Sequence, residues 1–589
     1  MNVKKMMCLL TATILLSAQS ISVGAFDSSE HPEISTAMNS SYFAGASEPS
    51  AEIVVDAETL PSSFDLRDKN LVSSVKNQKS YAICWAESAV ALLESELITA
   101  HPDIDLSEWQ LAYYTYSKKF GFPLPEISPD PEDAFLQGGN YFLLTPMLVN
   151  WISPALESDY PFERTELLNP DTDAETLQAQ SAYHVTDSCL IEYDPYSDNF
   201  ENQINNMKQI IYDGHAVAIN YINVTANYTT TATGSRNFYN SPSSLQNGSY
   251  HAVTVVGWDD NYSASNFKTT PDRDGAWLCK NSWGSTWGND GYFWMSYAEE
   301  SCLQPYYLKV EEKNQHYKQF YHDDFGWWSS VSFLGGTNTS YMANVFTADE
   351  DTLLTSAMFA TAMENENYEV QVYKNLRSSS RPTSGTSSAG IASGKMDSCG
   401  YHTVDLEKPV RIQAGETFSV VVKLSGNSGK HVTCESYVAT TTEYPDGTAN
   451  FRENLSEEQI LEGFSARQSF YSSNGTSWND IYTAGTINDV YTTVENGQTV
   501  DVTSYTRLGN LCVRGVAQLL GDVNLDGTVD ASDASDVLIY AAALGSGDAS
   551  DEKDAQWFGR ADLNHDGSLS ADDASELLQI AAKLGSGEE

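Results

Sequence analysis

The sequence predicts three folded domains in a row: an α+β domain of two lobes, an all-β sandwich and a small all-α domain. The 589 residues are too many for a single hydrophobic core. Helical periodicity dominates the chain after Cys84 and gives way to short β-rich segments after Ile191. Near the C-terminus, a loop followed by one helix occurs twice, which indicates an internal repeat.

The chain is strongly acidic. It has 80 Asp and Glu against 32 Lys and Arg, a formal net charge of −48. Nucleic acid and anionic membrane surfaces repel such a chain, so we expect neither as a partner. No apolar stretch beyond the N-terminal region approaches the length of a membrane-spanning helix, so we expect no membrane insertion.

The N-terminal segment, residues 1–25, has the pattern of a secretory signal peptide. Two lysines precede a short apolar run, and Val23-Gly24-Ala25 offers small residues for cleavage. We therefore expect a secreted, extracellular protein. Residues 26–57 are rich in Ser, Ala and Glu without a helical period, and we interpret them as a disordered leader or short pro-region.

Cysteines are sparse in the rest of the chain. Seven remain: Cys84, Cys189, Cys279, Cys302, Cys399, Cys434 and Cys512. They are too few for a disulfide scaffold, and for all but Cys84 a buried thiol is the expected state, although the sequence leaves their pairing open.

Cys84 lies where a helix is expected to begin. The residues that follow it have the apolar spacing of a buried helix: Trp85, Ala89, Leu92, Leu93 and Leu97. The positive end of a helix dipole and its unpaired N–H groups stabilise a thiolate, which is the nucleophilic form of cysteine. An ordinary buried cysteine is the commoner alternative, so the interpretation depends on partners elsewhere in the chain.

Four ordered motifs supply such partners. They are V-K-N-Q-x5-C-W-A with Gln78 and Cys84, Q-G-G-N-Y from Gln137, H-A-V-x-V-V-G from His251, and K-N-S-W-G-x-x-W-G-x-x-G-Y with Asn281. On these motifs, residues 58–312 resemble the papain-like cysteine peptidases. The resemblance implies a two-lobed fold with a cleft, in which Cys84 comes from the first lobe and His251 and Asn281 come from the second.

The resemblance also implies a Cys–His–Asn mechanism without a cofactor. Asn281 would hold one ring nitrogen of His251 and leave the other facing Cys84, so that a thiolate–imidazolium pair forms before substrate arrives. Gln78 and the Cys84 N–H would stabilise the oxyanion. Trp283 would shield the His–Asn hydrogen bond from water. Together with Trp283, the substrate-binding positions that the resemblance implies are Gly138, Gly139, Tyr141 and Ile219.

Periodicity predicts the elements of this first domain. We expect helices over 84–100, 107–118 and 144–151, and strands over 216–221, 251–258, 276–280 and 291–296. The insertions 223–249 and 259–275 are interpreted as surface loops near His251, whose effect on substrate access is left open.

Residues 313–516 are expected to form a β-sandwich. Strand-like segments occur at 368–373, 401–406, 416–424 and 511–517, with a Ser/Gly/Thr-rich loop over 377–394. In order and texture this region resembles the lectin-like domain that follows papain-like domains in some clostridial proteins. A glycan partner is one alternative, since Trp327, Trp328 and Trp478 could stack on sugars, but such aromatic residues are more often core.

Residues 517–589 carry the ligand pattern of two calcium loops. Loop positions 1, 3, 5, 7, 9 and 12 are Asp522, Asn524, Asp526, Thr528, Asp530 and Asp533 in the first copy, and Asp562, Asn564, Asp566, Ser568, Ser570 and Asp573 in the second. Oxygen ligands without Cys or His indicate two structural Ca²⁺ ions. Position 12 is Asp rather than Glu and no helix is expected before Asp522, so the repeat differs from an EF-hand. It resembles a dockerin, which implies a cohesin module of a scaffoldin as partner.

Two functions are consistent with these features. The first is a secreted cysteine endopeptidase anchored to a cohesin-bearing, cellulosome-type scaffold. The second is a catalytically inactive papain-like adhesion or binding protein with a glycan-binding β domain on the same scaffold. The complete set of Gln78, Cys84, His251 and Asn281 favours the enzyme, because an inactive protein has no need to keep it.

Overall fold

A computed structural model describes the fold over most of the chain. The described residues are 34–38, 60–116, 131–136, 138–169, 171–181, 183–232, 234–241, 248–333, 338–426, 431–445, 449–453, 463–484, 486–495, 498–547 and 553–586. The predicted signal segment 1–25 and Gln137 lie outside these ranges. Within them, no helix is both long and apolar enough to cross a membrane.

The first lobe is helical, as predicted. Its main helices are α2 (Cys84–Leu97), α3 (Glu108–Thr115) and α4 (Tyr141–Val149). The Ser107 hydroxyl accepts the Gln110 N–H at the start of α3, and the Asn140 side chain accepts the Phe142 N–H at the start of α4. The cap at Asn140 is why α4 begins three residues before the predicted helix.

The second lobe is a β-sheet with one long helix, α6 (Phe200–Tyr212), and its central strands match the prediction. The neighbours in the sheet are β10 (Leu303–Glu312), β4 (Val217–Asn223), β7 (Ser249–Asp259), β8 (Ala276–Lys280) and β9 (Tyr292–Ser296). The predicted surface loop 223–249 contains two short strands, β5 (Tyr228–Thr230) and β6 (Arg236–Phe238), and β6 pairs with β9.

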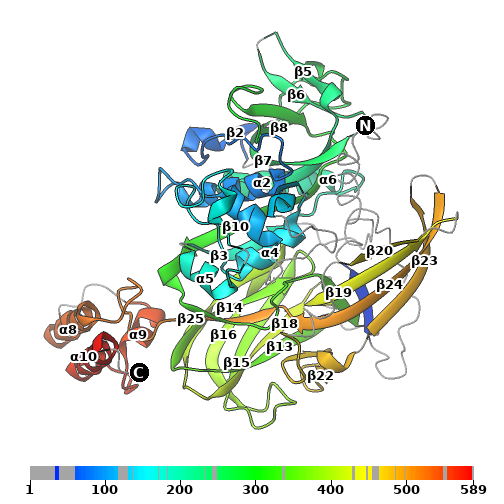
Figure 1. The fold of residues 1–589 in the computed structure, drawn as a ribbon. Coiled ribbons are helices and arrows are strands. Elements are labelled where there is room, and N and C mark those ends of the chain that lie inside the picture. The colour runs from blue at the N-terminus through cyan, green and yellow to red at the C-terminus, as the bar shows by residue number, and fades with distance from the viewer. Residues whose placement is uncertain are drawn as a thin grey trace.

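This sheet continues without a break into the second domain, below the first in Figure 1. β3 (Tyr183–Leu190) of the first domain pairs with β10 on one side and with β17 (Cys399–Ile412) of the second domain on the other. Beyond β17 follow β14 (Thr352–Thr361), β25 (Val513–Gln518) and β11 (Lys318–Phe320). Backbone hydrogen bonds therefore join the two domains.

The second domain is the predicted β-sandwich. Opposite the shared sheet lies a sheet of β16 (Thr386–Met396), β15 (Glu366–Lys374), β18 (Thr417–Ser425), β13 (Thr339–Thr347), β21 (Ser469–Ser472) and β22 (Asn479–Asp480). A third sheet contains β12 (Ser329–Phe333), β19 (His431–Glu443), β20 (Ala449–Glu453), β24 (Gln498–Leu511) and β23 (Thr486–Glu495). Buried apolar side chains such as Leu354, Phe418 and Val422 fill the core of the domain.

Two predictions about irregular segments were wrong. The expected loop 377–394 is partly strand, because β16 begins at Thr386 and pairs with β15. The expected disordered leader contributes β1 (Ile34–Met38), which pairs antiparallel with β12. In both segments, small polar residues gave no strand pattern in the sequence. Each strand forms because a partner strand supplies hydrogen-bond partners for its backbone N–H and C=O groups.

Two of the three tryptophans considered for sugar stacking are core residues. Trp327 is 4 % exposed and Trp328 is 8 % exposed, and both pack near Phe142 of α4. Trp478 is half-buried and contacts the ring of Tyr341 edge-on. The core interpretation is therefore confirmed for the first two.

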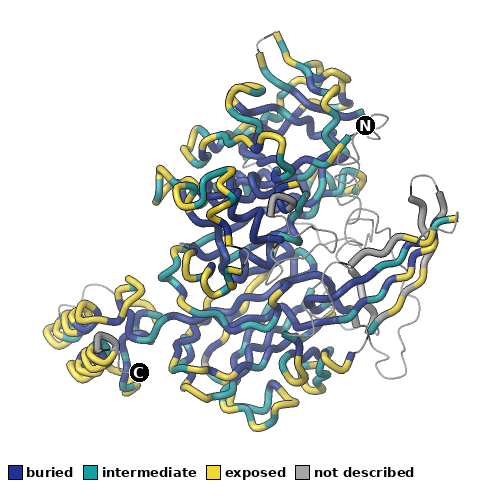
Figure 2. The backbone as a smooth tube through the Cα atoms, viewed as in Figure 1, coloured by how far each residue is buried: buried dark blue, intermediate teal, exposed yellow. Residues whose placement is uncertain are grey.

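The C-terminal domain is all-α, as predicted, and projects from the sandwich (Figure 1). It consists of α8 (Ala531–Ser546), α9 (Ala555–Ala561) and α10 (Ala571–Ser586), which enclose a small apolar core. The outer faces of α8 and α10 are exposed (Figure 2). The sequence did not predict α9, which leads directly into the second loop and packs against β17.

Candidate active site

Cys84 is the first residue of α2 and is partly exposed. Ile83 at the N-cap supplies no side-chain acceptor, and the backbone N–H groups of Trp85 and Ala252 face the sulfur. The seven cysteines in the described ranges are all free thiols; six are buried, and Cys84 is half-buried. Cys84 is therefore the most exposed cysteine in these ranges.

The second lobe presents His251 and Asn281 together. His251 lies on β7, and Asn281 follows the last residue of β8, the strand that pairs with β7. The Nε2–H of His251 donates to Asn281 Oδ1 at 2.8 Å, which leaves Nδ1 as the free ring nitrogen. The Trp283 ring stacks on the imidazole with centroids 4.7 Å apart. Trp283 thus covers the histidine, as the sequence resemblance implies.

Burial of this pair opposes the thiolate–imidazolium pair that the resemblance implies. Burial raises the pKa of the Cys84 thiol to about 11 and lowers the pKa of His251 to about 4. Both shifts favour the uncharged thiol and imidazole over the predicted ion pair, because burial removes the water that would solvate two charges. Among the described residues no hydrogen bond joins Cys84 to His251. Catalytic hydrogen bonds often tighten only when substrate binds.

Gln78 is held in place by the second lobe. Its backbone N–H donates to Ser282 O at 2.9 Å, and its Oε1 accepts from Ser282 Oγ at 2.6 Å. Its Nε2 donates to Tyr81 O at 2.8 Å, and a primary amide carries a second N–H for another acceptor. The loop before α2 and the segment after Asn281 therefore position one another.

Of the five predicted substrate-binding positions, two are core residues. Tyr141 is 1 % exposed and its hydroxyl donates to Ser188 O; Ile219 is 2 % exposed on β4. We therefore correct their predicted place in a specificity pocket to the core. Gly138 and Gly139 are partly exposed. A Cβ at Gly139 would lie 2.3 Å from the Trp85 ring, so only glycine fits there.

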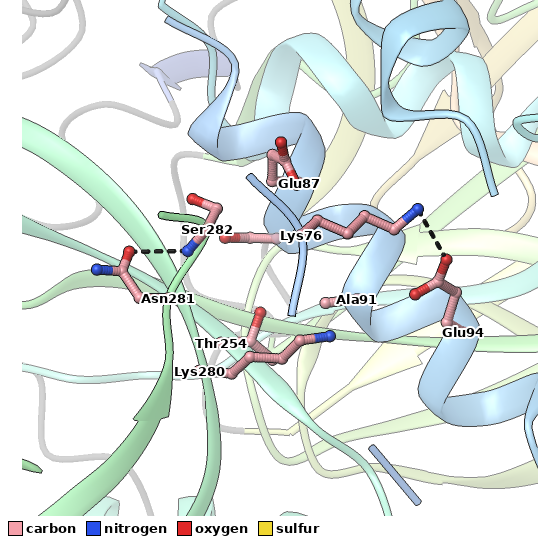
Figure 3. Close-up of a pocket in the computed structure, with 9 residues that line it drawn as sticks. Lys76, Glu87, Ala91, Glu94, Thr254, Lys280, Asn281 and Ser282 are labelled. Atoms are coloured by element: carbon pink, nitrogen blue, oxygen red, sulfur yellow. Dashed lines mark hydrogen bonds and ion pairs between the residues drawn. The ribbon is translucent and has the colours of Figure 1, made fainter. Parts of the chain in front are cut away.

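A buried ionic cluster beside Asn281 was missed by the sequence analysis. Lys76 lies 3.3 Å from Glu94 and 3.1 Å from Glu108, while Glu87 of α2 and Lys280 of β8 line a water-sized cavity of about 10 Å³ next to them (Figure 3). The sequence signal was present: Glu87 interrupts an apolar helix three residues after Cys84.

Replacing Glu87 with glutamine is expected to stabilise the protein more at pH 8 than at pH 5. Burial raises the pKa of Glu87 well above its usual range, and neither carboxylate oxygen has a hydrogen-bond partner. A carboxyl whose pKa is higher in the folded state binds more protons there, so stability is lost as pH rises toward that pKa. The uncharged amide should raise the free energy of unfolding at pH 8 by about 1–3 kcal/mol.

Thermal unfolding of the two proteins at both pH values measures this effect. Glu175→Gln, on the exposed surface of α5 (Ala174–Gln180), is the matched control and should change the Tm equally at pH 5 and pH 8. A Glu87→Gln protein with the same Tm change at both pH values would show that Glu87 is ionised in the fold.

The two predicted calcium loops have the carboxylates in place. In the first, Asp533 accepts the Val523 N–H at 2.7 Å and the Asp530 N–H at 2.9 Å, and Gly527 makes the turn with φ 87°. In the second, Asp573 is held by equivalent backbone donors. Asp562 Oδ1 is buried without a hydrogen-bond partner, as expected of a metal ligand. The donor set of oxygens fits calcium.

The fold and this site define a class of protein. A helix that begins at a partly exposed cysteine faces a β-lobe in which asparagine holds histidine, and this is the arrangement of the papain-like cysteine peptidases.

Comparison with models of known protein families supports this class. Residues 60–121 and 143–307 match the papain family cysteine protease model, residues 320–492 match the lectin like domain, and residues 520–579 match the dockerin type I domain. The chain therefore contains a papain-family cysteine protease domain, a lectin-like domain and a dockerin type I domain, in that order.

Individual relatives cover parts of the chain. The viral cathepsin of Adoxophyes honmai nucleopolyhedrovirus is 29 % identical over 248 residues, which are 42 % of this chain and 60 % of the relative. The viral cathepsin of Spodoptera litura multicapsid nucleopolyhedrovirus is 30 % identical over 236 residues, 40 % of this chain and 56 % of the relative. The chain thus spans less than two thirds of the length of these curated relatives.

A solved structure supports the fold of the first two domains. It contains the cysteine protease and lectin-like domains of Cwp84, a surface layer associated protein of Clostridium difficile. The two share 21 % sequence identity with a TM-score of 0.54, over 78 % of this chain and 89 % of that one. A peptidase followed by a lectin-like β domain is therefore a known arrangement.

Proposed function

We propose that this chain is a secreted cysteine endopeptidase that hydrolyses peptide bonds and is attached through its dockerin domain to a cohesin-bearing, cellulosome-type scaffold. The observation that carries the peptidase assignment is the His251–Asn281 hydrogen bond at 2.8 Å, in the lobe that faces the partly exposed Cys84. The lectin-like domain is compatible with a glycan partner, for which Trp478 is the partly exposed candidate.

The geometry supports a general-base route to the acyl-enzyme. At neutral pH burial keeps the proton on Cys84, so His251 Nδ1 would accept that proton as the sulfur attacks the peptide carbonyl. Asn281 holds the ring and stabilises the imidazolium that forms. The Gln78 amide and the Cys84 N–H would donate to the oxyanion.

The second half of the reaction uses the same residues. His251 then donates its proton to the leaving amine, which departs and leaves a thioester on Cys84. Water enters, His251 removes its proton, and the hydroxide attacks the thioester; as the carbon–sulfur bond breaks, His251 returns the proton to the Cys84 sulfur, which releases the acid and the free thiol. Trp283, stacked on the imidazole, keeps water from the His251–Asn281 hydrogen bond through both steps.

The dockerin domain supports the anchoring part of the proposal. Dockerin type I domains bind calcium, and the two loops here would each hold one ion. The large exposed apolar residues on α8 and α10, which are Leu538, Ile539, Leu544 and Leu578, would contact the cohesin. Attachment to such a scaffold places the enzyme outside the cell.

Cleavage-site profiling of the full chain beside Cys84→Ala tests the activity. The unmodified protein should cut internal peptide bonds, and Cys84→Ala should cut none. Iodoacetamide should modify Cys84 far faster than the six buried cysteines, because they are shielded from solvent. The urea-unfolded chain is the control, in which all seven should react at similar rates. Equal rates in the folded protein and no cleavage would support the inactive binding protein instead.

A further inference from the structure

Three side chains that bind metals in other proteins meet where the first two domains join. Asp187 and Cys189 lie on β3 of the peptidase domain, and His402 lies on β17 of the lectin-like domain. β3 and β17 pair there, with Cys189 opposite Gly400. One ligand atom from each side chain lies within 4.8 Å of the other two.

Hydrogen bonding points one nitrogen of His402 at the other two ligands. Nε2 lies 3.0 Å from the carbonyl oxygen of Ser398, which can only accept, so Nε2 carries a hydrogen. Nδ1 lies 3.5 Å from Cys189 Sγ and 3.5 Å from an Asp187 oxygen. A histidine that binds a metal usually donates its other N–H to a carbonyl in this way.

The distance between Cys189 Sγ and His402 Nδ1 fits a tetrahedral ion. Zinc bonds of about 2.3 Å to sulfur and about 2.0–2.1 Å to nitrogen place the two ligand atoms about 3.5 Å apart at a tetrahedral angle. The observed Sγ–Nδ1 separation is 3.5 Å. Cys189 is 0 % exposed and His402 is 3 % exposed, while Asp187 is partly exposed and would give the ion access.

We infer that Asp187, Cys189 and His402 form a zinc site that links the peptidase domain to the lectin-like domain, with the fourth position taken by water. Binding requires Cys189 as the thiolate, so its proton is released to solvent as the zinc–sulfur bond forms. The thiolate and the Asp187 carboxylate then balance the two positive charges. A thiolate and an imidazole select zinc, whereas the oxygen ligands of the dockerin loops select calcium.

Cobalt binding to the full Cys84→Ala chain, with calcium saturating the dockerin domain, tests the site. Co²⁺ in place of zinc should give a thiolate-to-cobalt absorption band at one equivalent, together with the intense visible bands of tetrahedral cobalt. Both sets of absorption bands should disappear when either Cys189→Ser or His402→Gln is added to the Cys84→Ala chain. Cys399→Ser, a neighbouring buried cysteine outside the cluster, is the matched control and should keep them.

Stability provides a second readout. Zinc should raise the Tm of the Cys84→Ala chain and leave that of the Cys189→Ser variant unchanged. If Cys189→Ser does not fold, the Asp187→Asn variant tests the metal site instead. Because Asp187 is partly exposed, this variant should fold, and it should bind cobalt about 10–100-fold more weakly. Absence of the thiolate band, an unchanged cobalt affinity in Asp187→Asn, or a Cys189–Cys399 disulfide found by mass spectrometry would each overturn the inference.

Discussion

Replacing His251 with alanine is expected to lower kcat/KM for a peptide substrate about 10⁴-fold at pH 7. Burial holds the pKa of the Cys84 thiol at about 11, four pH units above neutrality. Without a base, only about one sulfur in 10⁴ would then be ionised.

The pH dependence of this variant makes the prediction specific. The activity of His251→Ala should rise about tenfold per pH unit up to the thiol pKa, because hydroxide replaces the missing base. The unmodified enzyme should not show this rise, since His251 accepts the proton during attack. Initial rates with a fluorogenic peptide between pH 6 and pH 10 measure both profiles.

Asn281→Ala is the companion variant for the same assay. It keeps the base but loses the 2.8 Å hydrogen bond that orients the ring, so we expect a loss of about 10²-fold without the alkaline rise. Full activity in His251→Ala would show that another group activates Cys84. A low but pH-independent rate would show that the thiol is ionised without help.

Replacing Asp533 with alanine is expected to lower the calcium affinity of the first dockerin loop about 100-fold and to abolish cohesin binding. The Asp533 carboxylate accepts three backbone N–H groups, from Val523, Asn524 and Asp530, so it fixes both ends of the loop as well as supplying ligand oxygens. Loss of the Asp533 carboxylate also removes the capping box of α8, the helix whose exposed face would contact the cohesin.

Calorimetric titration of the calcium-stripped full chain measures this effect. The unmodified protein should bind two calcium ions and the variant one, through the loop that contains Asp573. Asp536→Ala is the matched control, since Asp536 lies on the exposed face of α8 three residues away and should leave both ions bound. A variant that still binds two ions would contradict the assignment of position 12.

Local segments were predictable because neighbouring residues determine them. The ligands of each calcium loop lie within twelve residues, so spacing alone sets their geometry. The apolar period after Cys84 predicted α2, and strand alternation predicted β7 and β8. The pairing of His251 with Asn281 followed from family motifs, and the register of β7 and β8 brings the two residues together.

Burial and long-range pairing decided the rest. Tyr141 became a core residue because α4 starts at that position and turns its side chain inward, and residues 34–38 became a strand because β12 offers unpaired backbone groups. The sequence by itself predicted which residues carry the chemistry, because motif spacing is local. Only the tertiary structure decided how deeply these residues are buried, and it brought Cys189 to His402 across 213 residues, because solvent exclusion and sheet order are properties of the whole fold.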